Sequence, residues 1–331
     1  MGSYLVTGST GFIGSTLCRA LVERGQRVRA FHRPDSPLTN LEGLEVEHII
    51  GDVTRPETLE TAMMGADVVF HTASQMSLRK GIPYLYEATV QGTRHVMEAA
   101  LKAGVSRVVH TSSVAAMGIP IEKNNGILNL IDENHTWNYI PKYWPYGHAK
   151  YLAELEVQQA VARGLDVVIV SPTVVIGAGD INLISGNLIL HVAQRQVPVA
   201  VTGGLNAVHV DDVVRGHLAA LERGQIGERY ILGNQNLTHL DYIKTIASVT
   251  GSPVPLIVLP GRIMRHLTGP VSIARRLFHL PIGGSTARRT GYLFYYSTEK
   301  AGTELSLSKP LPLHQAVEEA YAWYVGQGMV N

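Results

Sequence analysis

Strand-sized apolar runs alternate with longer helical patterns along the first half of the chain. Val167-Val168-Ile169-Val170 is typical of these runs, and near-continuous apolar sequences of this kind indicate strands buried on both faces. The pattern predicts strands at 4–7, 28–32, 67–71, 107–111 and 167–171, and helices at 15–24, 56–64, 86–103 and 146–163. Strand, helix and strand in regular succession predict an α/β fold, a doubly wound parallel sheet with right-handed crossovers.

Three glycines follow the first predicted strand in Gly8-Ser9-Thr10-Gly11-Phe12-Ile13-Gly14. At this spacing the first glycine permits a tight turn, the second lets the backbone approach a pyrophosphate, and the third lets helix and strand pack closely. Exposed N–H groups and the positive end of the helix then receive the phosphate charge. We therefore predict a Rossmann-type dinucleotide site whose contacts are Gly8, Thr10, Gly11, Phe12 and Ile13. A glycine-rich turn that only packs is the alternative.

The second strand ends in His32-Arg33, where a carboxylate would mark NAD. A guanidinium at this position suits a ribose 2′-phosphate, because it presents a charged planar fork to phosphate oxygens. Asp35 lies just beyond and weakens this prediction, and a solvated arginine is the alternative. NADP(H) is favoured and NAD(H) stays possible.

Ends of other predicted strands supply further expected cofactor contacts at the carboxyl edge of the sheet, where ligands of open parallel sheets bind. Gly51-Asp52-Val53 closes a further strand, where an acid could accept from the adenine amino group or be an ordinary exposed strand-end carboxylate. Small side chains after the strand 67–71 would let the backbone run beside the cofactor. These expected contacts are Asp52, Val53, Thr72, Ala73, Ser74, Pro172, Val174 and Val175.

Tyr146 and Lys150 stand one turn apart on the same face of a predicted helix. A phenol transfers protons poorly at neutral pH unless its pKa falls from about 10. An ammonium about 4 Å away contributes roughly 4 kcal/mol at an effective dielectric of ~20, enough to lower that pKa by about three units. Ser113, at the end of the strand 107–111, could hydrogen-bond a carbonyl oxygen and stabilise the developing alkoxide. We predict Ser113, Tyr146 and Lys150 as a catalytic triad; a helix face with a solvated lysine is the alternative.

Composition and charge exclude several classes of protein. The 331 residues are 45% hydrophobic and 17% charged, which excludes disorder, and the formal charge of +1 gives no field for nucleic acid or an anionic membrane. The single cysteine, Cys18, excludes a disulfide framework. No metal site is expected, no apolar run is long enough for a membrane helix, and no address precedes the first strand, so we predict a cytoplasmic protein.

The chain resembles the extended short-chain dehydrogenases/reductases, the family that includes the NAD-dependent epimerases and dehydratases. The resemblance rests on Gly8-x-x-Gly11-Phe12-Ile13-Gly14, Thr111-Ser112-Ser113, Tyr146-x-x-x-Lys150, Ser171-Pro172-Thr173 and His209-Val210-Asp211-Asp212. It implies that Tyr146 is the catalytic acid/base and that Lys150 lowers its pKa and binds the nicotinamide ribose. It also implies that Ser113 is the catalytic serine and that His209 is structural.

Two sequence motifs distinguish the branches of this family. Sugar-nucleotide enzymes usually have Arg-x-x-Asn where this chain has Ser171 and Val174, and Arg-Asp where it has Leu205-Asn206. With Arg33, these differences make the chain similar to the dihydroflavonol-reductase-like branch. The resemblance then implies NADPH-dependent reduction of a ketone or aldehyde. A sugar-nucleotide epimerase or dehydratase, a hydroxysteroid-type dehydrogenase and a cofactor-binding redox sensor are the alternatives.

The resemblance suggests the domain organisation, as does the less regular alternation of predicted strands and helices after Ser171. A cofactor domain is expected at 1–171 plus about 206–234, and a substrate lobe at about 172–205 plus 235–331. We expect a small carbonyl or alcohol as the substrate and a homodimer as the assembly. A basic segment from Arg262 to Arg289 could hold an anionic substrate tail, or be a solvated face.

Overall fold

A seven-stranded parallel sheet forms the centre of the protein, which is described here from a computed structural model covering residues 2–121, 130–266 and 288–330. Its order is β10-β6-β5-β4-β1-β2-β3, and every neighbouring pair is parallel. The strands are β1 (Ser3–Thr7), β2 (Arg27–His32), β3 (Glu47–Ile50), β4 (Val68–His71), β5 (Arg107–Thr111), β6 (Val167–Pro172) and β10 (Arg229–Leu232). The predicted doubly wound sheet is confirmed. Its strand order reverses between β1 and β4, which places a ligand crevice at their carboxyl ends.

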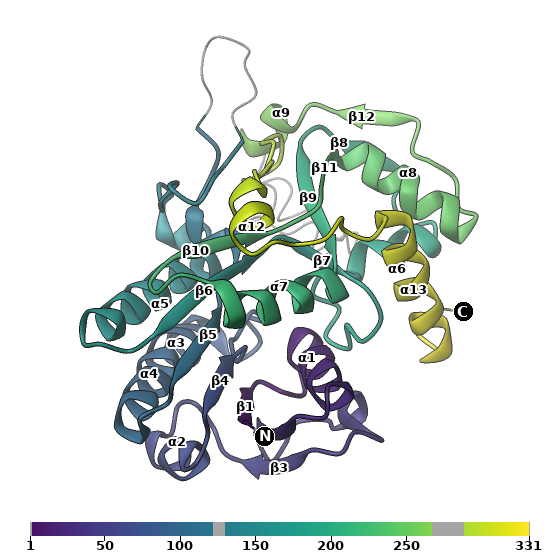
Figure 1. Cartoon of the computed structure of the whole chain (residues 1–331). Coiled ribbons are helices and arrows are strands. Elements are labelled where there is room, and N and C mark those ends of the chain that lie inside the picture. The colour runs from purple at the N-terminus through teal and green to yellow at the C-terminus, as the bar shows by residue number, and fades with distance from the viewer. Residues whose placement is uncertain (1, 122–129, 267–287, 331) are drawn as a thin grey trace.

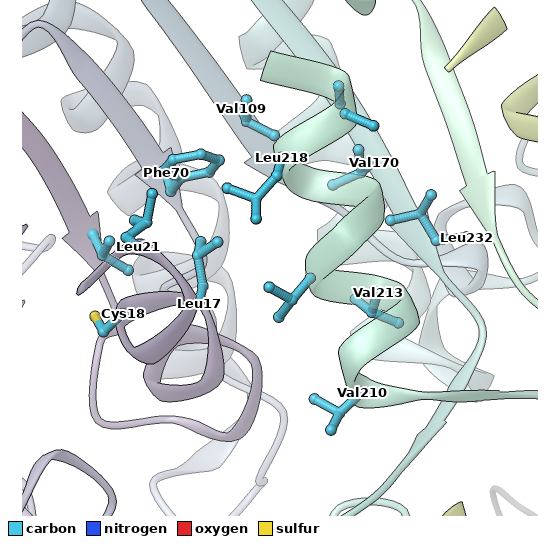
Figure 2. Close-up of a cluster of buried hydrophobic side chains, with 14 of the residues drawn as sticks. Leu17, Cys18, Leu21, Phe70, Val109, Val170, Val210, Val213, Leu218 and Leu232 are labelled. Atoms are coloured by element: carbon cyan, nitrogen blue, oxygen red, sulfur yellow. The ribbon is translucent and has the colours of Figure 1, made fainter. Parts of the chain in front are cut away.

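Side chains alternate between the two faces of the sheet, so each buried strand contributes side chains to two hydrophobic cores. Val6, Phe70 and Val109 pack on one face against α1 (Phe12–Glu23) and α7 (Val210–Arg223), two helices that Figure 1 labels, and Figure 2 shows Phe70 and Val109 there. Their neighbours Leu5, Val69 and Val108 pack on the other face. That face is covered by α2 (Pro56–Met63), α4 (Gly92–Ala103) and α5 (Pro145–Ala162). Burial on both faces explains the continuous apolar run Val167-Val168-Ile169-Val170 of β6, in which every residue is buried.

The helix expected at 86–103 begins earlier than the sequence pattern indicated. It starts as α3 (Gly81–Tyr86), passes through a π-turn, η2 (Glu87–Gln91), and continues as α4. Gly104 ends it in the left-handed conformation at φ 68°. The π-turn carries Thr89, whose side chain lies beside the segment that follows β4. Single π-turns inside helices often mark functional sites.

A second group of elements packs at one end of the large sheet (Figure 1). Its sheet has the order β11-β9-β7, with β7 (Val174–Ile176) parallel and β11 (Gln235–Thr238) antiparallel to β9 (Gly204–His209). Around it lie α6 (Asn187–Ala193), α8 (His239–Thr250) and α13 (Leu313–Gly326), whose buried side chains share one core. The remaining elements are β8 (Val199–Val201), β12 (Ile257–Leu259), α9 (Gly261–His266), α12 (Glu299–Glu304) and the short helices η1 (Thr39–Leu41), η3 (Val114–Met117) and η4 (Pro141–Tyr143).

None of the helices in the described ranges combines the length and the apolar character needed to cross a bilayer.

Candidate active site

The predicted phosphate loop forms a tight cradle between β1 and α1. Gly8 has φ +70°, and a Cβ there would lie 2.7 Å from the backbone of Ala73. A Cβ on Gly14 would lie 2.3 Å from the carbonyl oxygen of Gly8 and 2.7 Å from Oγ1 of Thr72. No side chain can be added at either glycine without moving backbone. The loop can therefore place its N–H groups beside a ligand only with these residues.

The first turn of α1 is open to an anion. Gly11 is the N-cap residue and has no side chain to accept from the first N–H groups, and no acidic residue occupies the first turn. Thr10, Phe12 and Ile13 complete the loop, and Phe12 belongs to the same apolar cluster as Val175 at the start of the second sheet. The unsatisfied N–H groups and the positive helix end together suit a pyrophosphate.

The segment Thr72-Ala73-Ser74 after β4 lies directly beside this loop. The Thr72 hydroxyl donates to the carbonyl of Thr7 at 2.7 Å, and the Ala73 N–H approaches Oγ1 of Thr7 at 3.4 Å. Ser74 contacts Thr89 of the π-turn at 3.5 Å. The structure therefore brings the predicted contacts after β1 and β4 together at one edge of the sheet.

Two further predicted contacts occupy neighbouring strand ends. The guanidinium of Arg33, after β2, donates to the hydroxyl of Tyr84 on α3 at 3.1 Å and lies 3.6 Å from the Asp35 carboxylate. Asp52, after β3, uses one carboxylate oxygen to accept from Thr54 N–H and hydroxyl, both at 2.9 Å. Arg33 is thus held by a residue far along the chain, which sequence spacing could not reveal. Val53 is buried next to Asp52.

The end of β6 leads straight into the second sheet. Pro172 pairs with Leu232 of β10, and Val174 and Val175 begin β7. These residues therefore lie at the junction of the two groups of elements, beside Phe12 of the phosphate loop through Val175.

Ser113, Tyr146 and Lys150 come together at the carboxyl end of β5. Tyr146 and Lys150 lie in the first turns of α5, and Ser113 is the N-cap residue of η3, where its hydroxyl accepts from Ala115 N–H at 3.2 Å. Ser113 also hydrogen-bonds the Tyr146 phenol. Lys150 is 3% exposed, and its ammonium donates to the Thr111 carbonyl oxygen at 2.8 Å. Ser113 and the Thr111 carbonyl that accepts from Lys150 thus lie at the same strand end, and Ser113 contacts Tyr146.

The electrostatics of the phenol differ from the expectation. Burial raises the pKa of Tyr146 to about 12, and the hydrogen bond with Ser113 is what opposes this rise. Burial also lowers the pKa of Lys150 to about 8. The expectation that Lys150 alone brings the phenol near neutrality is therefore wrong for the free protein. Helix spacing measures the distance between two groups but not the cost of burying the phenolate.

Three buried histidines, which the sequence analysis missed, surround the strand ends next to Lys150. His217 of α7 donates from Nδ1 to the Val213 carbonyl at 2.8 Å, so its Nε2 accepts from the Thr111 hydroxyl at 2.7 Å. His71 bridges the hydroxyls of Thr7 and Thr93 at 2.8 and 3.1 Å, and His110 lies beside it. Burial lowers the pKa of His71 to about 3 and that of His217 to about 4. They are neutral groups that fix β1, β4 and β5.

His209, Asp211 and Glu319 form a cluster with metal-ligand spacing. The Asp211 N–H donates to Nδ1 of His209 at 3.0 Å, so Nε2 carries the proton and donates to Glu319 at 2.9 Å. Both ring nitrogens are therefore engaged in tying β9, α7 and α13 together. This arrangement agrees with the structural role that the resemblance implied.

The described part of the basic segment stacks on aromatic rings. The guanidinium groups of Arg265, Arg288 and Arg289 lie 3.6, 4.1 and 4.0 Å from the ring centroids of Tyr292, Tyr143 and Trp144, respectively. Residues 267–287 of the segment lie outside the described ranges.

Comparisons with known proteins show the family of the chain. The model of the NAD dependent epimerase/dehydratase family matches residues 4–233. The chain belongs to that family. It is 36% identical to a putative dihydroflavonol 4-reductase of Synechocystis, over 99% of this chain and 96% of that protein. It is 34% identical to sterol demethylase protein B of Methylococcus capsulatus, over 98% and 99% of the two chains. The crystal structure of gox2253 superposes with a TM-score of 0.86 at 35% identity and full coverage of both chains.

Membership of the epimerase/dehydratase family makes the chain an NAD(P)-dependent enzyme of the extended short-chain dehydrogenase/reductase type. The residues present fit the dinucleotide on structural grounds alone. The glycine cradle leaves no room for side chains, and the uncapped start of α1 offers N–H groups to its phosphates. Lys150 and Tyr146 lie at the same sheet edge as the cradle, where the nicotinamide half of a dinucleotide would reach them.

The cradle of this family member predicts the effect of one added methyl group. Gly14→Ala places a Cβ against the Gly8 carbonyl and Thr72, so the loop must open. Its N–H groups then no longer point toward the phosphates of the cofactor. We expect the affinity for NAD(P)H, measured from the fluorescence of the bound cofactor, to fall by about tenfold or more. Gly302→Ala is the control, because a Cβ at that helical glycine meets nothing within 4 Å. Unchanged affinity in Gly14→Ala would show that the turn only packs.

Proposed function

We propose that this enzyme reduces a ketone or aldehyde with NADPH, with Tyr146 as the proton donor. The observation that carries the proposal is the geometry at the carboxyl end of β5, where Ser113 hydrogen-bonds the phenol of Tyr146 and the ammonium of Lys150 donates to the neighbouring Thr111 carbonyl at 2.8 Å. Burial raises the pKa of the phenol to about 12, so Tyr146 holds a proton that it can deliver to an alkoxide.

Each member of the triad has a separate task in this reaction. The nicotinamide, when bound, supplies hydride to the carbonyl carbon. Ser113 donates a hydrogen bond to the carbonyl oxygen and so stabilises the negative charge that develops there. Tyr146 then transfers its proton to that oxygen, and Lys150, one helical turn further along α5, would stabilise the phenolate left behind. Both hydrogen-bonding groups stand on rigid elements, the end of β5 and the start of α5.

The positions that could hold a sugar nucleotide support this choice. Ser171 is fully buried in β6, and Leu205 packs in the core of the second sheet. Asn206 is 1% exposed and accepts from Thr173 at 2.9 Å. Its amide nitrogen donates to Asn236 at 2.8 Å. These side chains serve packing and strand pairing, so they do not offer the polar groups expected around a nucleotide diphosphate.

Arg33 is the basis for NADPH rather than NADH. Tyr84 holds its guanidinium at 3.1 Å, and the Lys80 ammonium lies 4.7 Å from the centre of the Tyr84 ring. Arg33 directly follows β2, where the adenosine ribose of a dinucleotide would lie, and its guanidinium could pair with a 2′-phosphate there. Asp35 offers a weaker, 3.6 Å contact to the same guanidinium.

Removal of the phenolic oxygen tests the reaction. In Tyr146→Phe we expect kcat for NADPH-dependent reduction to fall by about 10²- to 10⁴-fold, because the proton donor is gone, with little change in NADPH affinity. The assay follows NADPH consumption with a panel of aldehydes and ketones. Tyr151→Phe, on the same helix, is the control and should keep its activity. Wild-type turnover in Tyr146→Phe would refute the proposal, and exchange of sugar-nucleotide isomers without NADPH consumption would identify an epimerase.

Loss of the guanidinium tests the choice of cofactor. In Arg33→Ser we expect the KM for NADPH to rise by about 10- to 100-fold, as charge-assisted hydrogen bonds to the phosphate are lost, while the KM for NADH changes little. Arg27→Ser removes an exposed arginine of the same strand, paired with Glu47, and should leave both values unchanged. Equal effects on the two cofactors, or no effect, would contradict a 2′-phosphate site.

A further inference from the structure

Glu154 is a buried carboxylate next to the catalytic lysine that the proposed reaction leaves without a role. It follows Lys150 by one helical turn on α5, so both side chains face the sheet. Glu154 is 2% exposed, and Lys150 is 3% exposed. A buried carboxylate is costly unless it is paired and hydrogen-bonded, so its partners indicate what it does.

Both oxygens of Glu154 are engaged by residues from other elements. The hydroxyl of Ser112 donates to Oε1, and the guanidinium of Arg229 on β10 donates to Oε2. Arg229 also donates to the carbonyl of His135 at 3.1 Å. The carboxylate therefore connects α5, the end of β5 and β10 at one buried point.

Ser112 stands between the two groups of β5 that the reaction uses. Its neighbour Thr111 supplies the carbonyl that accepts from Lys150, and its other neighbour is Ser113. The backbone N–H of Ser112 donates to Val170 at 2.8 Å, so the Glu154 contact fixes the side-chain end of a residue whose backbone is already paired. A shift of Ser112 would move the acceptor of Lys150 and the catalytic serine together.

The charges around the Lys150 ammonium give Glu154 a second task. His71 faces it from β4 and His110 from β5, and burial keeps the pKa of each imidazole far below its ordinary range, so both are neutral. Tyr146, on the same helix, is protonated. Burial lowers the pKa of Lys150, and the negative charge of Glu154 opposes that change. Burial raises the pKa of Glu154 itself, and Arg229 is the first of the groups that oppose this rise.

We propose that Glu154 is a positioning residue for the catalytic lysine. Through Ser112 its carboxylate holds the Thr111–Ser113 strand end, and its charge keeps the buried ammonium of Lys150 protonated. The inference rests on the proposed function, because it assigns Glu154 a role in a reaction that uses Lys150 and Tyr146. Arg229 contributes to the same role, because its positive charge keeps the carboxylate of Glu154 ionised.

Glu154→Gln tests this role, because the amide can still accept from Ser112 but carries no charge. With its counter-charge removed, Lys150 loses its proton at lower pH. We expect the alkaline limb of the kcat profile to move down by about one pH unit or more, so that activity on that limb falls about tenfold. At acidic pH the variant should stay within a few-fold of wild type. The pH dependence of NADPH affinity, which needs no substrate, should shift in the same direction.

The matched control is Glu156→Gln, two residues along the same helix. Glu156 is also a largely buried carboxylate paired with an arginine, Arg94, at 2.8 Å, but it faces α4 and not Lys150. Its substitution should lower the melting temperature without moving either pH profile. If an unpaired Arg229 unfolds the single variant, Glu154→Gln combined with Arg229→Met removes both charges and should show the same alkaline shift.

The two hypotheses fail in different ways. If Glu154→Gln loses activity equally at every pH, or its profiles superimpose on those of the wild type, Glu154 is a structural residue and this inference is wrong. That conclusion holds while Tyr146→Phe is inactive in the same assay. If the wild-type protein and Tyr146→Phe behave alike, the proposed function fails, and the NADPH-affinity profile alone then decides whether Glu154 sets the charge of Lys150.

Discussion

The active site depends on how the positively charged amine of Lys150 is stabilised inside the protein, at the carboxyl edge of the parallel sheet. Lys150 places its ammonium on the Thr111 carbonyl at 2.8 Å, with a carboxylate one turn away and neutral imidazoles on the neighbouring strands. Desolvation works against the charge, and these polar groups offset that cost. These groups hold Lys150 one helical turn from Tyr146 on α5.

The parallel sheet explains why so many polar groups meet there. In a doubly wound sheet all strands end at the same edge, so the segments after β1, β4 and β5 and the first turn of α5 are neighbours although they are far apart in sequence. The apolar cores on the two faces, one of them seen in Figure 2, hold these ends rigid. The candidate catalytic groups lie at the carboxyl edge of the sheet. The cofactor cradle depends on glycines that let the loop contact the neighbouring strand end.

Much of the fold and of the candidate site could be predicted from the sequence, because both depend on short-range patterns of residues. Continuous apolar runs predicted the large sheet, and spacing alone predicted that Tyr146 and Lys150 share a helix face. The second sheet left no comparable apolar run, since its strands include polar sequences such as Gln235-Asn236-Leu237-Thr238 of β11. Glu154 could have been found, since it follows Lys150 at helical spacing. Arg229, His217 and Tyr84 could not, because they reach the site from distant elements. The phenol pKa was misjudged because burial, unlike spacing, is not written in the sequence. The domain boundaries, the homodimer and the cytoplasmic location stay predictions.

The account stands on a single protonation state, that of Tyr146, and this can be measured directly. Tyrosine labelled with ¹³C at Cζ reports each phenol in a pH titration by NMR, and Tyr146→Phe assigns the resonance. The account predicts that Tyr146 in the free protein titrates clearly above the ordinary value of 10.0, near 12, and therefore carries its proton at neutral pH. A titration of that resonance near pH 7 would contradict it, because the free enzyme would then hold a phenolate ready to remove protons.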